Sequence, residues 1–388
     1  MEKPVYLDNA ATTPLDRRVL EAMLPHLGGE RGNPSSLHAS GASAREAVEK
    51  ARGSVAELIG ASPQEIVFTG GGTEADNLAV LGLARAASAE KRHVVISRVE
   101  HAAVREAARR LESEGFEVSR VGVDSDGLVD PAEFERALRP DTAFAAVVWA
   151  NNEVGTVQPV GALAEICAEW GIPLHTDAVQ AAGRTGLDVG EVPVATLAVS
   201  GHKLYGPQGV GALCVRAGLD LDPIVYGGGQ EGGRRSGTEN VAGLVGLGEA
   251  ARLAAEELVE RSRYEKRLRE AILEGVAEIP GIRINGHRER RLTNNAHLSV
   301  EGVEVEALVL FLDSLGYAIG SGSACASGSS GHKASPVLLA MGRGERDAFS
   351  AVRITVGKDN EPEEVEGFLE AFSAAVSRLR ELSPLYTG

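Results

Sequence analysis

The chain has 388 residues, of which 43% are hydrophobic and 24% charged, and its formal net charge is -16. This length and composition predict a globular protein of two or three domains with a large core. The negative charge argues against nucleic acid or an anionic membrane surface as a partner, because both attract basic proteins.

The first residues and the cysteine count set expectations for location. The start, "MEKPVYLDNAATTP", lacks the apolar core of a secretory signal, and the longest apolar run, "AFAAVVWA", is too short to span a bilayer. Three cysteines without a CxxC pair indicate no disulfide framework, and neither they nor the histidines have metal-ligand spacing. We expect a cytoplasmic protein with no metal and no membrane segment. Cys167 and Cys214 lie in helical and strand patterns and are expected to be buried.

Five short apolar runs between residues 65 and 199 predict strands, each followed by a polar cluster. They cover residues 65–68, 93–97, 143–150, 172–176 and 196–199. Helical patterns such as "DNLAVLGLARAA" lie between them, and this alternation predicts βαβ units with a parallel sheet. Ligands bind beyond the carboxyl ends of the strands in such sheets. We therefore expect the five polar clusters to meet at one site.

A long helical pattern begins near Glu239 and leads into a smaller α/β unit. Strands are expected there in "HLSVEG", "AIGSGSAC" and "VRITVG". The segment before Leu15 is too short to fold alone and must dock elsewhere. We expect a large domain over residues 15–255 and a small domain formed by residues 1–14 and 256–388. Cys325 lies among glycines and serines, which predict a mobile loop over about residues 321–334.

Lys203 and Asp177 each follow a predicted strand. A lysine amine can lose its proton and attack a carbonyl group, whereas arginine cannot. A phosphate-binding or solvated loop lysine is the alternative. A carboxylate at Asp177 could hold a protonated pyridine nitrogen, as pyridoxal phosphate requires, or could simply cap a turn. Together the two residues could bind both ends of one cofactor ring.

Three further features are candidate parts of the site, and two of them have a second interpretation. The glycine turn "TGGGTEADN" opens a helix, and its backbone N–H groups with the Thr73 hydroxyl predict an anion site that lacks a nucleotide motif. His101 could stack on a planar ring and move protons, or could cap a helix. Arg353, on a predicted strand, could bind a substrate carboxylate through two hydrogen bonds or form an ordinary salt bridge.

Ten motifs in order from Tyr6 to Gly357 resemble those of one enzyme family. They are "YLDNAATTP", "GNPSSLH", "FTGGGTEADN", "EHAAV", "NNEVGTVQP", "DAVQAAG", "SGHKLYGPQGVG", "RRSGTEN", "GSGSACASG" and "VRITVG". On these motifs the chain resembles a cysteine desulfurase of the NifS/IscS family, among the fold-type-I pyridoxal-phosphate enzymes. The resemblance implies a large domain with a mostly parallel seven-stranded sheet flanked by helices, and a smaller α/β domain.

The resemblance also implies roles for individual residues. Lys203 resembles the Schiff-base lysine, Asp177 the partner of the pyridine nitrogen, and His101 the stacking histidine that moves protons. The other implied contacts are Asn152 and Gln180 near the phenolic oxygen, Gly72, Thr73, Ser200 and His202 at the phosphate, and Arg353 with Asn152 at the substrate. Thr238 resembles a phosphate ligand supplied by a neighbouring subunit, which implies a homodimer with shared sites.

The implied activity is conversion of L-cysteine to L-alanine, with the sulfur held on Cys325 as a persulfide. A sulfur-acceptor protein would then receive it, either an iron–sulfur scaffold or a tRNA-thiolation protein. Other interpretations stay open at this point. They are a selenocysteine lyase, another enzyme of the class-V aminotransferase type, and a protein that only holds assembly partners. Intact Lys203, Asp177 and Cys325 argue against the last.

Overall fold

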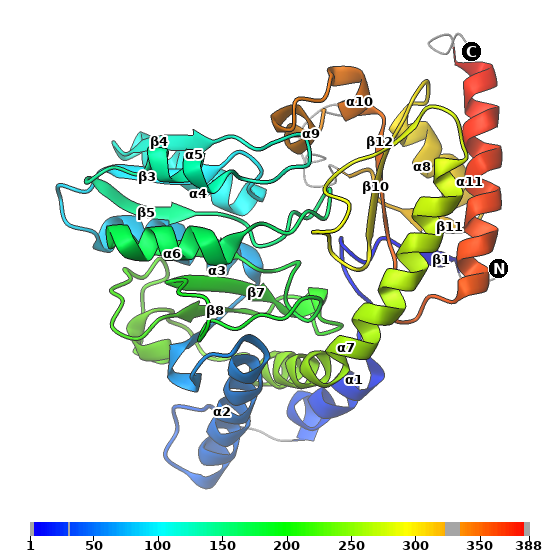
Figure 1. Ribbon diagram of the computed structural model, residues 1–388. Helices are drawn as coiled ribbons and strands as arrows, with labels where there is room; N and C mark the ends of the chain where they lie inside the picture. The colour runs from blue at the N-terminus through cyan, green and yellow to red at the C-terminus, as the bar shows by residue number, and fades with distance from the viewer. Residues whose placement is uncertain (1–3, 30–31, 323–333, 384–388) are drawn as a thin grey trace.

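The computed structural model of the chain describes residues 4–29, 32–322 and 334–383 (Figure 1). Cys325 and most of the loop expected over residues 321–334 fall outside these ranges. The helices are α1 (Arg17–Leu24), α2 (Ala39–Ile59), α3 (Gly72–Ala86), α4 (Ala102–Ser113), α5 (Pro131–Ala137), α6 (Val160–Trp170), α7 (Val241–Ala277), α8 (Val305–Ser314), α9 (Pro336–Ala340), α10 (Glu345–Phe349) and α11 (Pro362–Leu382).

A seven-stranded sheet forms the centre of the larger part of the molecule (Figure 1). Its strands lie in the order β2-β8-β7-β6-β5-β3-β4. β8 runs antiparallel to both of its neighbours, and the other neighbouring pairs are parallel. This confirms the mostly parallel sheet. The strands are β2 (Ile66–Thr69), β3 (His93–Ser97), β4 (Glu117–Val121), β5 (Thr142–Ala146), β6 (Leu174–Asp177), β7 (Thr196–Ser200) and β8 (Gly211–Val215).

The central strands are buried along their whole length because helices cover both faces of the sheet. In β3, Val94 and Ile96 pack with residues of α3 and α4, whereas Val95 packs on the opposite side with Leu163 of α6. This alternation follows from the two-residue period of a strand. The two cysteines expected in the core, Cys167 and Cys214, are both buried.

One predicted strand is shorter than expected, and not every strand was predicted. The strand predicted over residues 143–150 ends at Ala146, and the following residues form an irregular segment that enters the site. β4 was not predicted, because it is an edge strand whose sequence, "EVSRV", is mostly solvated and therefore carries little apolar signal.

A second hydrophobic core lies beyond the middle of α7, which connects the two parts of the molecule (Figure 1). Its sheet has the order β12-β10-β9, with β9 (Ile282–Ile284), β10 (Asn295–Val300) and β12 (Ala351–Thr355) antiparallel. The N-terminal β1 (Val5–Leu7) pairs in parallel with β11 (Tyr317–Ile319), and Leu7 joins this second core. The strand expected in "AIGSGSAC" ends at Ile319 in the described part of the chain.

Within the described residues, no helix combines the length and the apolar character that crossing a membrane requires.

Candidate active site

A cavity of about 1000 Å³ opens at the carboxyl ends of the parallel strands, and all five predicted polar clusters contribute to its wall. Most of the expected site residues line it: Gly72, Thr73, His101, Asn152, Asp177, Gln180, Ser200, His202, Lys203 and Arg353. The expectation that the clusters meet is confirmed. Thr238 is exposed and is not part of this lining, and Cys325 lies outside the described residues.

Lys203 ends a single turn of 3-10 helix (Gly201–Lys203) directly after β7. Its Nζ donates hydrogen bonds to the carbonyl oxygens of Ala10, at 2.5 Å, and Ala11, at 2.6 Å. Gln180, three residues beyond the end of β6, donates through Nε2 to the same Ala10 oxygen at 3.0 Å. The N-terminal segment, which was expected to dock somewhere, therefore forms part of the cavity wall beside the lysine.

The turn after Lys203 holds a strained residue. Tyr205 has φ of 62°, a left-handed conformation that is rare for an aromatic residue. Thr13 helps to fix it, because the Tyr205 N–H donates to Thr13 Oγ1 at 2.8 Å and this hydroxyl donates to the His202 carbonyl at 3.0 Å. Such strain persists only where surrounding contacts impose it, and it is concentrated at functional sites.

Asp177 is the last residue of β6, and its side chain lies at the floor of the cavity. It is 5% exposed and accepts a hydrogen bond from the Val179 N–H at 2.9 Å. Burial raises the pKa of Asp177, while the His101 ring, this N–H group and the Lys203 amine act to lower it. A buried carboxyl group with such neighbours is suited to a cationic partner.

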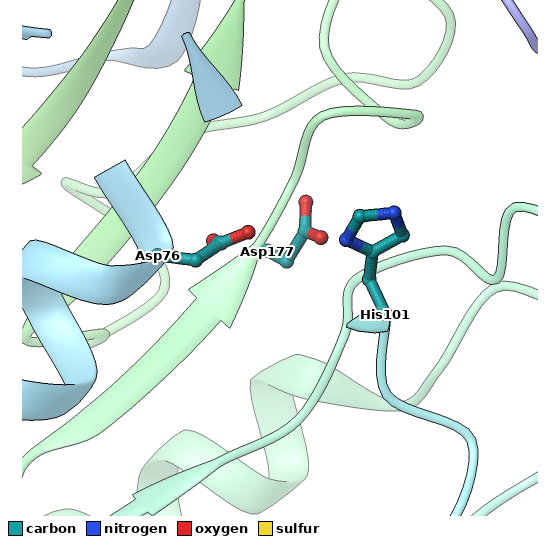
Figure 2. A group of neighbouring side chains, drawn as sticks. All are labelled: Asp76, His101 and Asp177. Carbon is teal, nitrogen blue, oxygen red and sulfur yellow. The ribbon is translucent and has the colours of Figure 1, made fainter. Parts of the chain in front are cut away.

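His101 combines both roles considered for it in the sequence. Its Nδ1 accepts the Ala103 N–H at 3.2 Å, so the side chain caps the N-terminus of α4. The ring also lines the cavity, and Figure 2 shows the Asp177 carboxyl group between this ring and Asp76. Since Nδ1 accepts a hydrogen bond, Nε2 carries the proton of the neutral ring.

The N-terminus of α3 forms one end of the cavity. Its N-cap residue, Gly71, has φ of 146° and no side chain with which to cap the helix N–H groups. A Cβ atom on Gly72 would lie 2.7 Å from Val179 Cγ2, so glycine is needed for this close approach. Burial and the Lys203 charge lower the pKa of His202 to about 4, which keeps that ring neutral and able to donate to an anion. The geometry fits a phosphate group.

Arg353 of β12 reaches the cavity from the second part of the molecule and is 3% exposed. Its guanidinium group pairs with Asp8 Oδ1 at 2.8 Å and donates to the Asn152 carbonyl at 2.9 Å. The salt bridge considered as the alternative is therefore present in the same residue that lines the cavity. Asp8 holds the planar group in one orientation, which suits recognition of a carboxylate.

Sequence reasoning missed several buried ionisable residues that surround this site. Three of them line the cavity: Asp76, Glu100 and Glu153. His175 lies behind Asp76, with 3.3 Å between His175 Nε2 and Asp76 Oδ1. The available signal was position, because Asp76, Glu100 and Glu153 all lie in the polar clusters that follow predicted strands. Burial, which makes them unusual, depends on how the elements pack.

Glu100 gives a prediction about stability and pH. Its pKa is raised to about 8, chiefly by burial, against the opposing effects of hydrogen bonds from Ser97 and Val148. Between its ordinary value of 4.5 and 8, the folded state therefore binds a proton that the unfolded state has released. The stability due to Glu100 is complete below pH 4.5 and is lost as the pH rises through 8.

We expect Glu100→Gln to remove this loss. The free energy of unfolding of the variant, relative to wild type, should rise between pH 5 and pH 8 by on the order of 2–4 kcal/mol. Urea unfolding at several pH values measures it, with the exposed Glu46→Gln as the matched control. If the free energy of unfolding changed with pH in the same way for wild type and Glu100→Gln, this would contradict the assignment of a protonated Glu100.

Comparison with known proteins identifies the class. The family model described as aminotransferase class-V matches residues 5–368, and the chain belongs to this family. Its relatives include a cysteine desulfurase IscS from Neisseria meningitidis, 46% identical over 100% of this chain and 95% of the relative. A cysteine desulfurase IscS from Methanosarcina thermophila is 43% identical over 99% of this chain and 94% of that protein. A solved NifS-like protein superposes with a TM-score of 0.91 at 37% identity, covering 97% of this chain and 100% of that one. Within the class, the chain is of the cysteine desulfurase type.

Enzymes of this family generally depend on pyridoxal phosphate. The residues of the cavity fit that group. The N-terminus of α3 suits its phosphate, the buried Asp177 carboxyl group suits a protonated pyridine nitrogen, and Lys203 offers an amine to its aldehyde.

Proposed function

We propose that the protein is a pyridoxal-phosphate-dependent cysteine desulfurase that converts L-cysteine to L-alanine and passes the sulfur to Cys325. The observation that carries this proposal is a single cavity lined by Lys203, Asp177, Arg353 and the N-terminus of α3. An amine, a buried carboxyl group, an anion site and a carboxylate-binding guanidinium group are the parts that amino-acid chemistry on this cofactor requires. Membership in a family with full-length desulfurase relatives supports it further.

Each residue is assigned a physical task. Gly72 and Thr73 at the start of α3, with Ser200 and His202, would hold the cofactor phosphate. Asp177 would hold the pyridine nitrogen, while Asn152 and Gln180 would contact the phenolic oxygen. When bound, the cofactor withdraws electrons from the Cα of the substrate so that its proton and the Cβ–S bond can be broken.

The substrate is placed and protonated by the protein. Arg353 would bind the cysteine carboxylate through two hydrogen bonds, with Asn152 beside it. Lys203 Nζ would bind the cofactor aldehyde and accept the Cα proton once released. His101 Nε2, which carries the proton of the neutral ring, would exchange protons with the substrate and stack on the cofactor.

The sulfur transfer balances without any further oxidant. The Cβ–S bond of cysteine breaks with its electron pair on carbon, and an S–S bond forms to Cys325. The substrate Cβ is reduced and gains one proton. The thiols of the substrate and of Cys325 supply two protons in total, and the second remains on the persulfide. Because the thiolate is the attacking form, Cys325 needs a proton acceptor, and we assign His101 to help once its Nε2 proton has passed to the substrate.

Two neighbours complete the proposal. Thr238 would contact the phosphate of a second copy of the chain, which is consistent with its exposure outside its own cavity, and the protein would act as a homodimer. A sulfur-acceptor protein, an iron–sulfur scaffold or a tRNA-thiolation protein, would receive the sulfur in the cytoplasm. The two hydrophobic cores support the division into a large domain over residues 15–255 and a small domain of residues 1–14 and 256–388, which stays a prediction.

The test is mass spectrometry of the purified protein after exposure to L-cysteine. We expect one additional sulfur atom on the peptide containing Cys325 and an equal amount of alanine. Parallel reactions with selenocysteine separate a desulfurase from a selenocysteine lyase. Alanine from selenocysteine alone, or sulfur on Cys167 or Cys214, would contradict the proposal.

A further inference from the structure

Four buried carboxyl groups line the cavity, and three of them, Asp76, Glu100 and Asp177, interact with one another and are called here the carboxyl cluster. Asp76 and Glu100 are each 1% exposed. One carboxylate oxygen of Asp76, one of Asp177 and one ring nitrogen of His101 all lie within 4.8 Å of one another (Figure 2). The activity proposed above uses Asp177 and assigns nothing to the other two.

Three negative charges cannot be sustained together at this floor. At about 4 Å and an effective dielectric constant of 20, two like charges repel strongly enough to shift a pKa by about three units. Each carboxylate would also lose its hydration on burial. Some of these groups must therefore be neutral acids, and the question is which one carries the charge.

The surroundings of Asp177 favour the charged form. The Val179 N–H donates to it at 2.9 Å, and both the His101 ring and the Lys203 amine lower its pKa. These contacts come from β6, the N-terminus of α4 and the turn after β7. Asp177 is therefore the member of the cluster whose negative charge a lysine amine stabilises.

The surroundings of Asp76 favour the neutral form. Its neighbour His175 is wholly buried, and burial lowers the pKa of that ring to about 3, so the ring is uncharged. Thr196 Oγ1 lies 2.9 Å from His175 Nδ1 on the far side of the ring. A neutral Asp76 can donate its O–H to His175 Nε2, which in turn leaves Nδ1–H to donate to Thr196. The pKa of Asp76 is raised by burial and by the charges of Asp177 and Glu100.

Glu100 is the second neutral member. Its Oε1 accepts hydrogen bonds from the Ser97 hydroxyl at 2.6 Å and the Val148 N–H at 2.8 Å. Its Oε2 is buried and has no hydrogen-bond partner within the described part of the chain. An orphaned carboxylate oxygen at this depth would be costly, whereas a protonated oxygen carries no charge. The His101 ring lowers the pKa of Glu100 and Asp177 raises it, and burial is the largest effect.

From this geometry we infer that Asp76 and Glu100 act as neutral carboxylic acids, so that the cluster holds one negative charge and that charge resides on Asp177. Both act through Asp177, because neither adds a second negative charge beside it. The use of this charge arrangement rests on the proposed function, since a single localised negative charge is what a protonated pyridine nitrogen requires. The inference applies to the protein with or without that cofactor.

Infrared spectroscopy of the protein as purified tests the charge state directly. Difference spectra of wild type minus Asp76→Asn, and of wild type minus Glu100→Gln, are recorded at pH 7. We expect each to show the carbonyl stretch of a protonated carboxylic acid, shifted in D₂O. Carboxylate bands in place of the acid band would overturn the inference. If Asp76→Asn does not fold, Asp76→Ser, which still donates a hydrogen bond, replaces it.

Cofactor binding provides the second measurement. We expect the neutral variants Asp76→Asn and Glu100→Gln to bind pyridoxal phosphate within about threefold of wild type, whereas Asp177→Asn weakens binding roughly 100-fold. The pH at which the absorbance of the bound cofactor changes should move by less than about 0.5 unit in the neutral variants. A shift of about one to three units, the effect of removing a real charge at this distance, would overturn the inference.

The two measurements separate the possible failures. Acid bands in a wild-type protein that takes up no pyridoxal phosphate would contradict the proposed function and support the charge distribution. The opposite outcome is a wild-type protein that binds pyridoxal phosphate and is an active desulfurase, while Asp76→Asn binds the cofactor as weakly as Asp177→Asn. That outcome would contradict the charge distribution and support the function.

Discussion

Lys203→Ala is expected to abolish covalent attachment of pyridoxal phosphate and to reduce alanine formation on the order of a thousandfold or more. The amine is placed at the end of β7, where it lines the same cavity as Asp177. Its hydrogen bonds to the Ala10 and Ala11 carbonyls fix its position. Borohydride reduction followed by peptide mass spectrometry measures the attachment, and a coupled assay measures alanine.

Two variants make this result specific. Lys203→Arg keeps the positive charge but cannot form a bond to an aldehyde, so it should fail in the same way. The exposed Lys266→Ala should behave as wild type. A reduced adduct on any other lysine, or turnover retained by Lys203→Arg, would refute the assignment.

Cys325→Ala is expected to keep the absorbance of the bound cofactor and to lose persulfide formation and sulfide release from L-cysteine, by about a thousandfold. The thiol supplies the only bond-forming atom for sulfur in the proposed transfer. The cofactor contacts come from other parts of the chain, so they should remain. Absorbance spectra, persulfide labelling and alanine release give the three readouts.

The other cysteines provide a matched control. Burial raises the pKa of Cys167 and of Cys214 to about 12, so neither thiol supplies thiolate near neutral pH. Cys167→Ala should therefore keep both sulfur transfer and cofactor binding. Undiminished turnover by Cys325→Ala would reject the role given to that thiol.

Much of the fold was predictable because its signals are local. The alternation of apolar runs and helical patterns indicated a parallel sheet, and strands such as His93–Ser97 were predicted to the residue. Position relative to strand ends placed Asp177 and Lys203 at one edge of the sheet. The edge strand β4 was not predicted, because a solvated strand has little apolar pattern.

The site was predictable only in part. The residue types at the strand ends predicted an anion site, a lysine amine and a carboxyl group, and the structure brings these groups to one cavity. The contact of Ala10 and Ala11 with Lys203 joins residues almost two hundred positions apart, and the pairing of Asp8 with Arg353 joins the two ends of the chain. Spacing along the sequence carries no information about such contacts.

The sequence by itself determined which chemical groups are present and at which strand ends they stand, because strand periodicity and turn residues act over a few positions. Only the tertiary structure decided that the N-terminal segment forms a wall of the cavity. It also decided which of three carboxyl groups bears the charge. Both outcomes depend on burial and on neighbours from distant segments, since the cost of removing a charge from water is set by everything packed around it.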